Sequence, residues 1–193
     1  FSRLTIASLA GVSRTPAREA IVNLEKEGLL KVIPQSGTYV ACINCKRSEQ
    51  EWFVRKSLEI GMVDAIFKNA SADMLDKMAE LNNRLINYDE ETESIPRIEI
   101  DNEFHQLIYE CSGEQLAKNI IKTQMSHYNR IRYLAELNKN ISVKTNDEHN
   151  MLIDAIRNKD KRMYLRVIKA HISRIFNELD KLKGIYPEYF EKN

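Results

Sequence analysis

The chain has 193 residues, of which 43% are hydrophobic and 30% are charged, and its formal net charge is +1. This composition excludes a disordered chain, and the length suits one mid-sized domain with a smaller one beside it. We expect no membrane span, because no run of about 18 apolar residues occurs, and a cytoplasmic protein, because an odd set of three cysteines favours a reducing compartment.

Two short helices are predicted at the start of the chain. Residues 2–10 carry apolar side chains at helical spacing, and Gly11 ends that run. Ser13 is a good N-cap for the next helix, in which Pro16 falls within the first turn and Gly28 marks the end. Between these limits apolar residues recur on one helix face, at Ala17, Ala20, Ile21 and Leu24.

The outward side of the second helix carries Arg14, Thr15 and Arg18 near its N-terminus. The recognition helix of a helix-turn-helix places side chains that contact bases and phosphates at these positions. The alternative is an ordinary amphipathic helix whose arginines are solvated. Residues 1–47 also carry seven Lys and Arg against three Asp and Glu, whereas the remainder is slightly acidic, which is typical of a DNA-binding head on a separate body.

A β-hairpin is predicted directly after this helix, with strands at 29–32 and 38–41 and a turn at 34–37. Two helices followed by such a hairpin make a winged helix-turn-helix. The stretch Leu9-Ala-Gly-Val-Ser-Arg-Thr-Pro-Ala-Arg-Glu-Ala20, with its continuation through Leu24–Leu30 to Gly37–Val40, resembles the signature of the GntR family of bacterial transcription regulators. The resemblance implies one more helix upstream, so that the head at 1–42 is incomplete at its N-terminus.

The head contains several candidate DNA contacts. Arg14, Thr15 and Arg18 would contact the major groove, with phosphates near the helix start at Ser13. A wing tip at Gly37 would allow close approach to the DNA, because glycine has no Cβ. Many relatives carry a DNA-contacting arginine on the first helix, where Leu4 stands in this sequence, next to Arg3. Either Arg3 takes that role or the contact is absent.

The rest of the chain is predicted to be an all-α bundle. Residues 43–48 are interpreted as a linker, and Cys42 and Cys45 beside it lack the second cysteine pair of a zinc site. Helical periodicity covers the second domain, 49–193, where short connections favour antiparallel packing. The predicted helices span 49–69, 71–88, 95–112, 114–138, 145–158 and 160–183, with caps at Ser71 and Asp160 and a capping box at Thr145–Glu148.

Polar residues interrupt the apolar stripes of three of these helices. Asp101 and His105 are four residues apart and project from one helix face, while His149 and His171 lie among leucines and isoleucines of two other helices. Three imidazoles and one carboxylate can bind a divalent transition metal of the zinc, nickel or manganese type. Taken singly, a histidine at such a position is more often an ordinary core or surface residue than a ligand. The fourth histidine, His127, is left outside the site.

The segments Asp101–His105 and Glu148–Ile156, with the helix that bears His171, resemble the ligand-binding domain of FadR-type GntR regulators, called FCD. This resemblance implies that the aspartate and the three histidines are the metal ligands, and that the effector is a small organic acid or a sugar acid. An arginine near the metal could clamp the effector carboxylate. The candidates are Arg55, which lies in an Arg-x-x-Leu-Glu segment, and Arg132.

Together these features predict a ligand-responsive transcription regulator, not an enzyme, that binds a palindromic double-stranded operator as a homodimer. A metal-dependent hydrolase is the rival class, since sites of three histidines and one aspartate can also support hydrolysis. However, Thr145 stands where a His-x-x-Glu-His motif needs its first histidine. A DNA-binding dimer without metal or ligand is the third possibility. Metal affinity is expected to fall below about pH 6, because the histidine ligands must be neutral.

Overall fold

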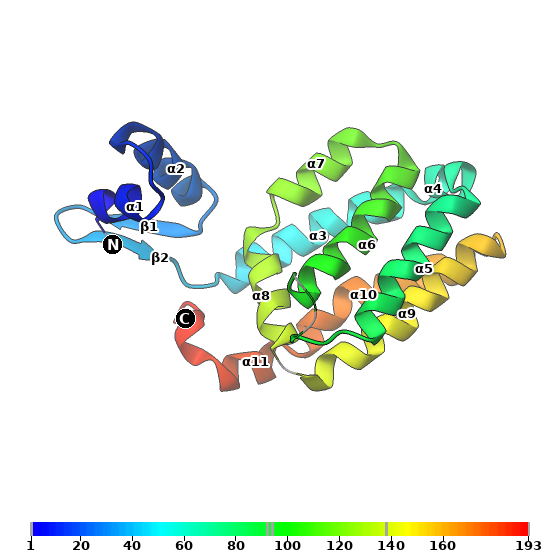
Figure 1. Cartoon of the computed structure of the whole chain (residues 1–193). Coiled ribbons are helices and arrows are strands. Elements are labelled where there is room, and N and C mark those ends of the chain that lie inside the picture. Colours follow the sequence, from blue (N-terminus) through cyan, green and yellow to red (C-terminus); the bar gives the residue numbers. More distant parts are fainter. Residues whose placement is uncertain (1, 92, 94, 138, 193) are drawn as a thin grey trace.

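The computed structural model describes residues 2–91, 93, 95–137 and 139–192, without the side chains of residues 3, 4 and 139–143. Figure 1 shows a small N-terminal head beside a larger bundle of helices. The head consists of α1 (Arg3–Leu9), α2 (Arg14–Lys26) and the antiparallel strands β1 (Leu30–Ile33) and β2 (Gly37–Val40). The predicted winged helix-turn-helix followed by a helical bundle is therefore confirmed.

The second helix of the head forms where the sequence pattern predicts it. Ser13 is the N-cap residue of α2 and has an extended backbone, although its side chain makes no capping hydrogen bond. Ala17 and Ile21 are buried, whereas Leu24 of the predicted apolar face is exposed. Gly28 follows the helix with a φ of +75°, a conformation that glycine adopts without steric cost.

The predicted helical segments of the body all contain helix, and some of them are broken in two, at Met62, at 124–125 and at Glu178. Helix α6 is flanked by α4, α5, α7 and α8, while α9 and α10 pack against each other (Figure 1). None of the described helices is long and apolar enough to cross a membrane. The helices are α3 (Cys45–Gly61), α4 (Val63–Asn69), α5 (Ala72–Ile86), α6 (Arg97–Ser112), α7 (Gln115–Thr123), α8 (Ser126–Glu136), α9 (Lys139–Arg157), α10 (Lys161–Asn177) and α11 (Leu179–Ile185), followed by a 3-10 turn at Pro187–Tyr189.

The helix caps test the sequence predictions one by one. Ser71 and Asp160 cap α5 and α10, since the side chain of each accepts a hydrogen bond from the backbone N–H of the third residue of its helix. The predicted capping box at Thr145 is wrong, because Thr145 lies inside α9. Its hydroxyl accepts a hydrogen bond from Arg174 Nη2 at 2.8 Å. A capping pattern cannot reveal such a partner on another helix.

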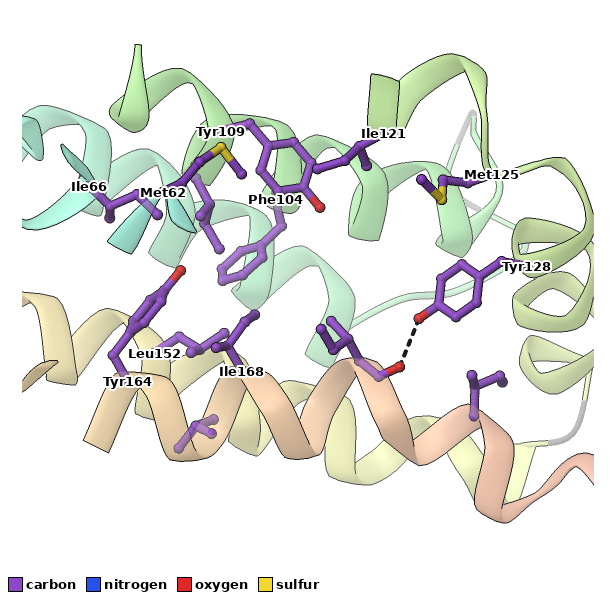
Figure 2. Close-up of a cluster of buried hydrophobic side chains, with 14 of the residues drawn as sticks. Met62, Ile66, Phe104, Tyr109, Ile121, Met125, Tyr128, Leu152, Tyr164 and Ile168 are labelled. Atoms are coloured by element: carbon purple, nitrogen blue, oxygen red, sulfur yellow. Dashed lines mark hydrogen bonds between the residues drawn. The ribbon is translucent and has the colours of Figure 1, made fainter. Parts of the chain in front are cut away.

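The core of the bundle joins the helices that carry the candidate site. Figure 2 shows Phe104, Leu152 and Ile168 packed together, and all three side chains are fully buried. Burial of each such side chain contributes about 1.5–3 kcal/mol. The Tyr128 hydroxyl donates a hydrogen bond to the backbone carbonyl of Ile172 at 3.0 Å, drawn as a dashed line in Figure 2. These contacts hold α6, α8, α9 and α10 in fixed relation.

The connection between the head and the bundle is short. Helix α3 begins at Cys45, so residues 45–48 of the 43–48 segment, interpreted as a linker, are helical. Ile43 donates its N–H to the carbonyl of Tyr189 at 2.7 Å and accepts from the N–H of Glu191 at 3.0 Å. The C-terminal segment thus holds the connector in a parallel bridge between Ile43 and Phe190.

Candidate functional site

The four residues that the sequence singles out in the bundle converge. Asp101 and His105 lie on α6, His149 on α9 and His171 on α10. One ligand atom from each residue lies within 4.8 Å of the ligand atoms of the other three. Three of the four residues are buried, and His171 is half-buried. The sequence prediction that these side chains face one another therefore agrees with the geometry.

His149 is held in one orientation and one tautomer. Its ring stacks on Phe104, with centroids 3.8 Å apart and planes at 9°. Its Nδ1 lies 3.2 Å from the side-chain oxygen of Asn82, whose amide nitrogen donates to the carbonyl of Asn146 and to the side chain of Asn150. Because the Asn82 oxygen can only accept, Nδ1 of His149 carries the proton. Nε2 therefore presents a lone pair toward Asp101 Oδ1, which is 3.5 Å away.

His171 is fixed in the same way by a carboxylate. Its Nδ1 lies 2.7 Å from Glu148 Oε2, and the same oxygen accepts a hydrogen bond from Arg174 Nη1 at 2.6 Å. Since a carboxylate can only accept, the proton of His171 is on Nδ1 and its Nε2 has a free lone pair. That Nε2 lies 3.0 Å from Nε2 of His105.

The donor atoms of this cluster fit a metal ion. Nε2 of His149 is buried and has no hydrogen-bond partner among the described residues, and Nε2 of His105 faces Nε2 of His171. A buried polar atom without a partner is costly, and a cation would satisfy the lone pairs that converge here. Three imidazole nitrogens and one carboxylate oxygen are a donor set that suits zinc and related divalent transition metals.

The electrostatics of the cluster keep His105 and His149 neutral and Asp101 charged. Burial lowers the pKa of His105 and of His149 well below the ordinary 6.5. Burial alone would raise the pKa of Asp101, but the Arg132 guanidinium beside it brings that pKa well below its ordinary value. All three groups are thus in the protonation state that metal binding requires.

Both candidate effector arginines border the cluster. Arg55 and Arg132 line a cavity of about 50 Å³ together with Asp101, His105 and His171. The Arg55 Nε donates to Glu59 Oε1 at 2.6 Å in a buried pair. Arg132 forms an ion pair with Asp101 and donates to Asn129 at 3.1 Å. Each arginine therefore has a partner that a bound anion would compete with.

A second, larger hollow of about 1010 Å³ lies next to the small cavity and shares Ile98 and Glu136 with it. Its described lining is rich in carboxylates from the 89–93 segment, with Glu136 and Asp147. An anion would be repelled there, whereas the small cavity presents guanidinium groups. The cluster and the small cavity are therefore the better candidate for an anionic ligand.

Three residues that shape the site had no site role in the sequence analysis. They are Asn82, Glu148 and Arg174. Asn82 is fully buried on α5, and Arg174 also lines the small cavity. For Glu148, its position next to the candidate ligand His149 was the one local indication of a role at the site. Asn82 offers no signal, because its partners Asn146, His149 and Asn150 are more than sixty residues away.

Four of the candidate DNA-binding residues lie together at the start of α2. Arg14, Thr15 and Arg18 are exposed on the first turns of α2, directly after Ser13. Gly37 is the first residue of β2 and pairs with Ile33, so the tip of the wing is formed by residues 34–36 and not by Gly37. The turn is one residue shorter than the predicted 34–37, because Gly37 pairs with Ile33 as part of the strand ladder. The backbone of Arg3 begins α1, and its side chain lies outside the described residues.

Two protein families match the chain. The FCD domain matches residues 52–174, and the family described as "Bacterial regulatory proteins, gntR family" matches residues 3–40. The chain is 26% identical over 192 residues to an uncharacterised HTH-type transcriptional regulator of an unstable DNA locus in Streptomyces ambofaciens, covering 98% of this chain and 80% of that protein. It is 24% identical over 187 residues to the HTH-type transcriptional repressor RspR of Escherichia coli, covering 94% and 79%.

Solved structures share the fold. E. coli McbR/YncC superposes with a TM-score of 0.73 at 20% identity, over 96% of this chain and 87% of that one. A putative GntR regulator from Rhodococcus sp. RHA1 gives a TM-score of 0.72 at 13% identity, over 95% and 86%. The family and the relatives are transcriptional regulators rather than enzymes, so the hydrolase alternative is set aside. The chain belongs to the GntR family of DNA-binding transcription regulators and carries an FCD domain behind its winged helix-turn-helix.

Proposed function

We propose that this regulator binds one divalent transition metal through Asp101, His105, His149 and His171, and that a small carboxylate effector binding beside the metal modulates operator binding. The observation that carries the proposal is the convergence of three imidazoles on one carboxylate, with His149 and His171 fixed by second hydrogen bonds and the buried Nε2 of His149 lacking a partner. The bound metal would supply a Lewis-acidic centre with open positions for a hard oxygen ligand.

The arginines at the cavity would recognise the effector carboxylate. Arg132 pairs with Asp101, and Arg174 pairs with Glu148, so both guanidinium groups are already oriented by buried or half-buried carboxylates. Arg55 lies over the ring of Tyr128 and is neutralised by Glu59. A carboxylate that enters the cavity would gain charge-assisted hydrogen bonds from these groups without the entropic cost of ordering them.

We further propose that the regulator acts as a homodimer on a palindromic operator. Ser13, Arg14, Thr15 and Arg18 would face the major groove, and the wing with Gly37 would approach the DNA backbone. Arg3, at the start of α1, is retained as a further candidate contact. An effector changes operator affinity only if it binds two orientations of the heads with different affinity.

The effector proposal is tested with metal-loaded protein and the DNA fragment that the protein itself selects from a random-sequence pool. One member of a panel of small mono- and dicarboxylates and sugar acids is expected to change DNA affinity by about tenfold. The change should be lost in Arg132→Met, because the clamp is removed, and kept in Arg162→Met, since Arg162 is exposed on α10. A panel with no effect, or equal responses of both variants, would exclude the carboxylate role of Arg132. Fluorescence anisotropy measures the affinity.

Glu148 is predicted to strengthen metal binding through His171. The Glu148→Ala variant should lower metal affinity by about 10- to 100-fold, because the hydrogen bond that fixes the tautomer and ring of His171 is lost. Glu148→Gln keeps an acceptor oxygen and should lose less. Asp154→Ala, an exposed carboxylate on the same helix, is the control. Competition with a chromophoric chelator gives the affinities, and equal affinities of Glu148→Ala and the control would exclude this role.

A further inference from the structure

The head meets the bundle at the first turn of α8. The Ser126 hydroxyl donates a hydrogen bond to the backbone carbonyl of Glu27 at 2.7 Å. The His127 ring lies against Gly28, so close that a Cβ at Gly28 would be 2.7 Å from His127 Nε2. Glu27 and Gly28 form the C-terminal end of α2, the helix that carries Arg14 and Arg18. The contact therefore acts on the helix that would lie in the DNA groove.

His127 also holds the connector between the two parts. The backbone N–H of Asn44 donates to Nδ1 of His127 at 3.1 Å. Because Nδ1 accepts this bond, the proton of the neutral ring is on Nε2, the atom that faces Gly28. Burial lowers the pKa of His127 and so favours this neutral form. One side chain thus contacts both the connector and the end of α2.

The first turn of α8 is itself rigidly placed. Glu51 of α3 is buried and accepts hydrogen bonds from the backbone N–H of Tyr128 at 2.8 Å and from the side chain of Arg47 at 3.0 Å. A carboxylate at this position also interacts favourably with the helix N-terminus. Arg132, which pairs with Asp101, lies five residues after His127 on the same helix, about 7.5 Å along its axis.

We propose that Ser126 and His127 form a docking site for the Glu27–Gly28 end of the recognition helix, and that this site holds the DNA-binding head in one orientation on the bundle. His127 is a positioning residue in this role. Helix α8 carries both the docking site and Arg132. An effector that displaces Arg132 from Asp101 would therefore shift α8 and, with it, the docked head. That last step rests on the proposed function, whereas the docking itself does not.

The test compares two glycine variants of the full chain, measured without metal, effector or DNA. Gly28→Ala introduces a Cβ that collides with His127, and Gly113→Ala places one at a nearly equal φ with no atom within 4 Å. Both variants carry the same backbone strain. Only Gly28→Ala is expected to release the head, so that ¹⁵N relaxation shows the head tumbling separately from the bundle and proteolysis at the 41–44 connector becomes about tenfold faster.

Two further variants keep the proposal falsifiable if Gly28→Ala folds poorly. Ser126→Ala removes one hydrogen bond to Glu27 and should loosen the head to a smaller degree. The double variant Gly28→Ala/His127→Ala should release the head by less than the sum of the two single effects, because the new Cβ has no ring to meet once His127 is replaced. Equal behaviour of Gly28→Ala and Gly113→Ala, or additive release in the double variant, would overturn the docking site. Either result is independent of whether metal or effector binds, so it leaves the proposed function to its own tests.

Discussion

Replacement of His149 by alanine is expected to lower the affinity of the protein for divalent transition metals by more than about 100-fold. His149 is fully buried, and its Nε2 is the partnerless nitrogen that faces Asp101. The variant loses one of four ligands and leaves the remaining three without a complete coordination sphere. Elemental analysis of purified, metal-loaded protein should find about one equivalent per chain in the wild type and none in the variant.

The matched control for this experiment is His127→Ala. His127 is also a buried histidine, but it contacts Gly28 and Asn44 instead of the cluster, so its replacement should leave the metal content unchanged. His105→Ala should behave as His149→Ala does. If the wild type holds no metal after loading at neutral pH, the proposed role of the metal is excluded. The histidines are then core residues or direct contacts of the effector.

Burial of the ligands also affects the pH dependence of metal binding. A histidine whose pKa is lowered stays neutral to a lower pH, so protons compete with the metal only under more acidic conditions. Because the pKa values of His105 and His149 both lie well below 6.5, the loss of metal affinity is expected at a lower pH than for exposed histidines. The approximate limit of pH 6 derived from ordinary histidines therefore moves downward.

The second large effect is expected at the head. The double variant Arg14→Ala/Arg18→Ala should bind its selected DNA at least about 100-fold more weakly, since each guanidinium that contacts a base edge contributes about 1–3 kcal/mol of discrimination. Both side chains are exposed at the start of α2, where a recognition helix meets the groove. The salt dependence of binding should also weaken, because phosphate contacts are lost. Fluorescence anisotropy at two or more salt concentrations measures both quantities.

The control removes the same charge from the bundle. Arg162→Ala/Arg166→Ala changes two exposed arginines on α10 and should leave DNA affinity unaltered. Equal losses in the two double variants would mean that net charge alone governs binding. Wild-type affinity in Arg14→Ala/Arg18→Ala would show that the groove is contacted by another surface.

The sequence by itself determined the features that depend on neighbours within a few residues. The helix end at Gly28 and the caps at Ser71 and Asp160 were predicted because each depends on one residue and the local backbone. The shared face of Asp101 and His105 follows from the helical repeat in the same way. The family motif of the head was readable for the same reason, since its residues are contiguous.

Only the tertiary structure decided what depends on contacts between distant segments. The sequence pattern places Leu24 on an apolar helix face and Thr145 at a helix start. The exposure of Leu24 and the bond from Arg174 to Thr145 inside α9 depend on which elements pack nearby. The hydrogen bond from His149 to Asn82 spans 67 residues, and no local pattern records it. His127 was left outside the site in the sequence analysis, because the family pattern does not use this position. Its contacts arise from the packing of α2 and the connector against the start of α8, and that packing is a property of the folded chain alone.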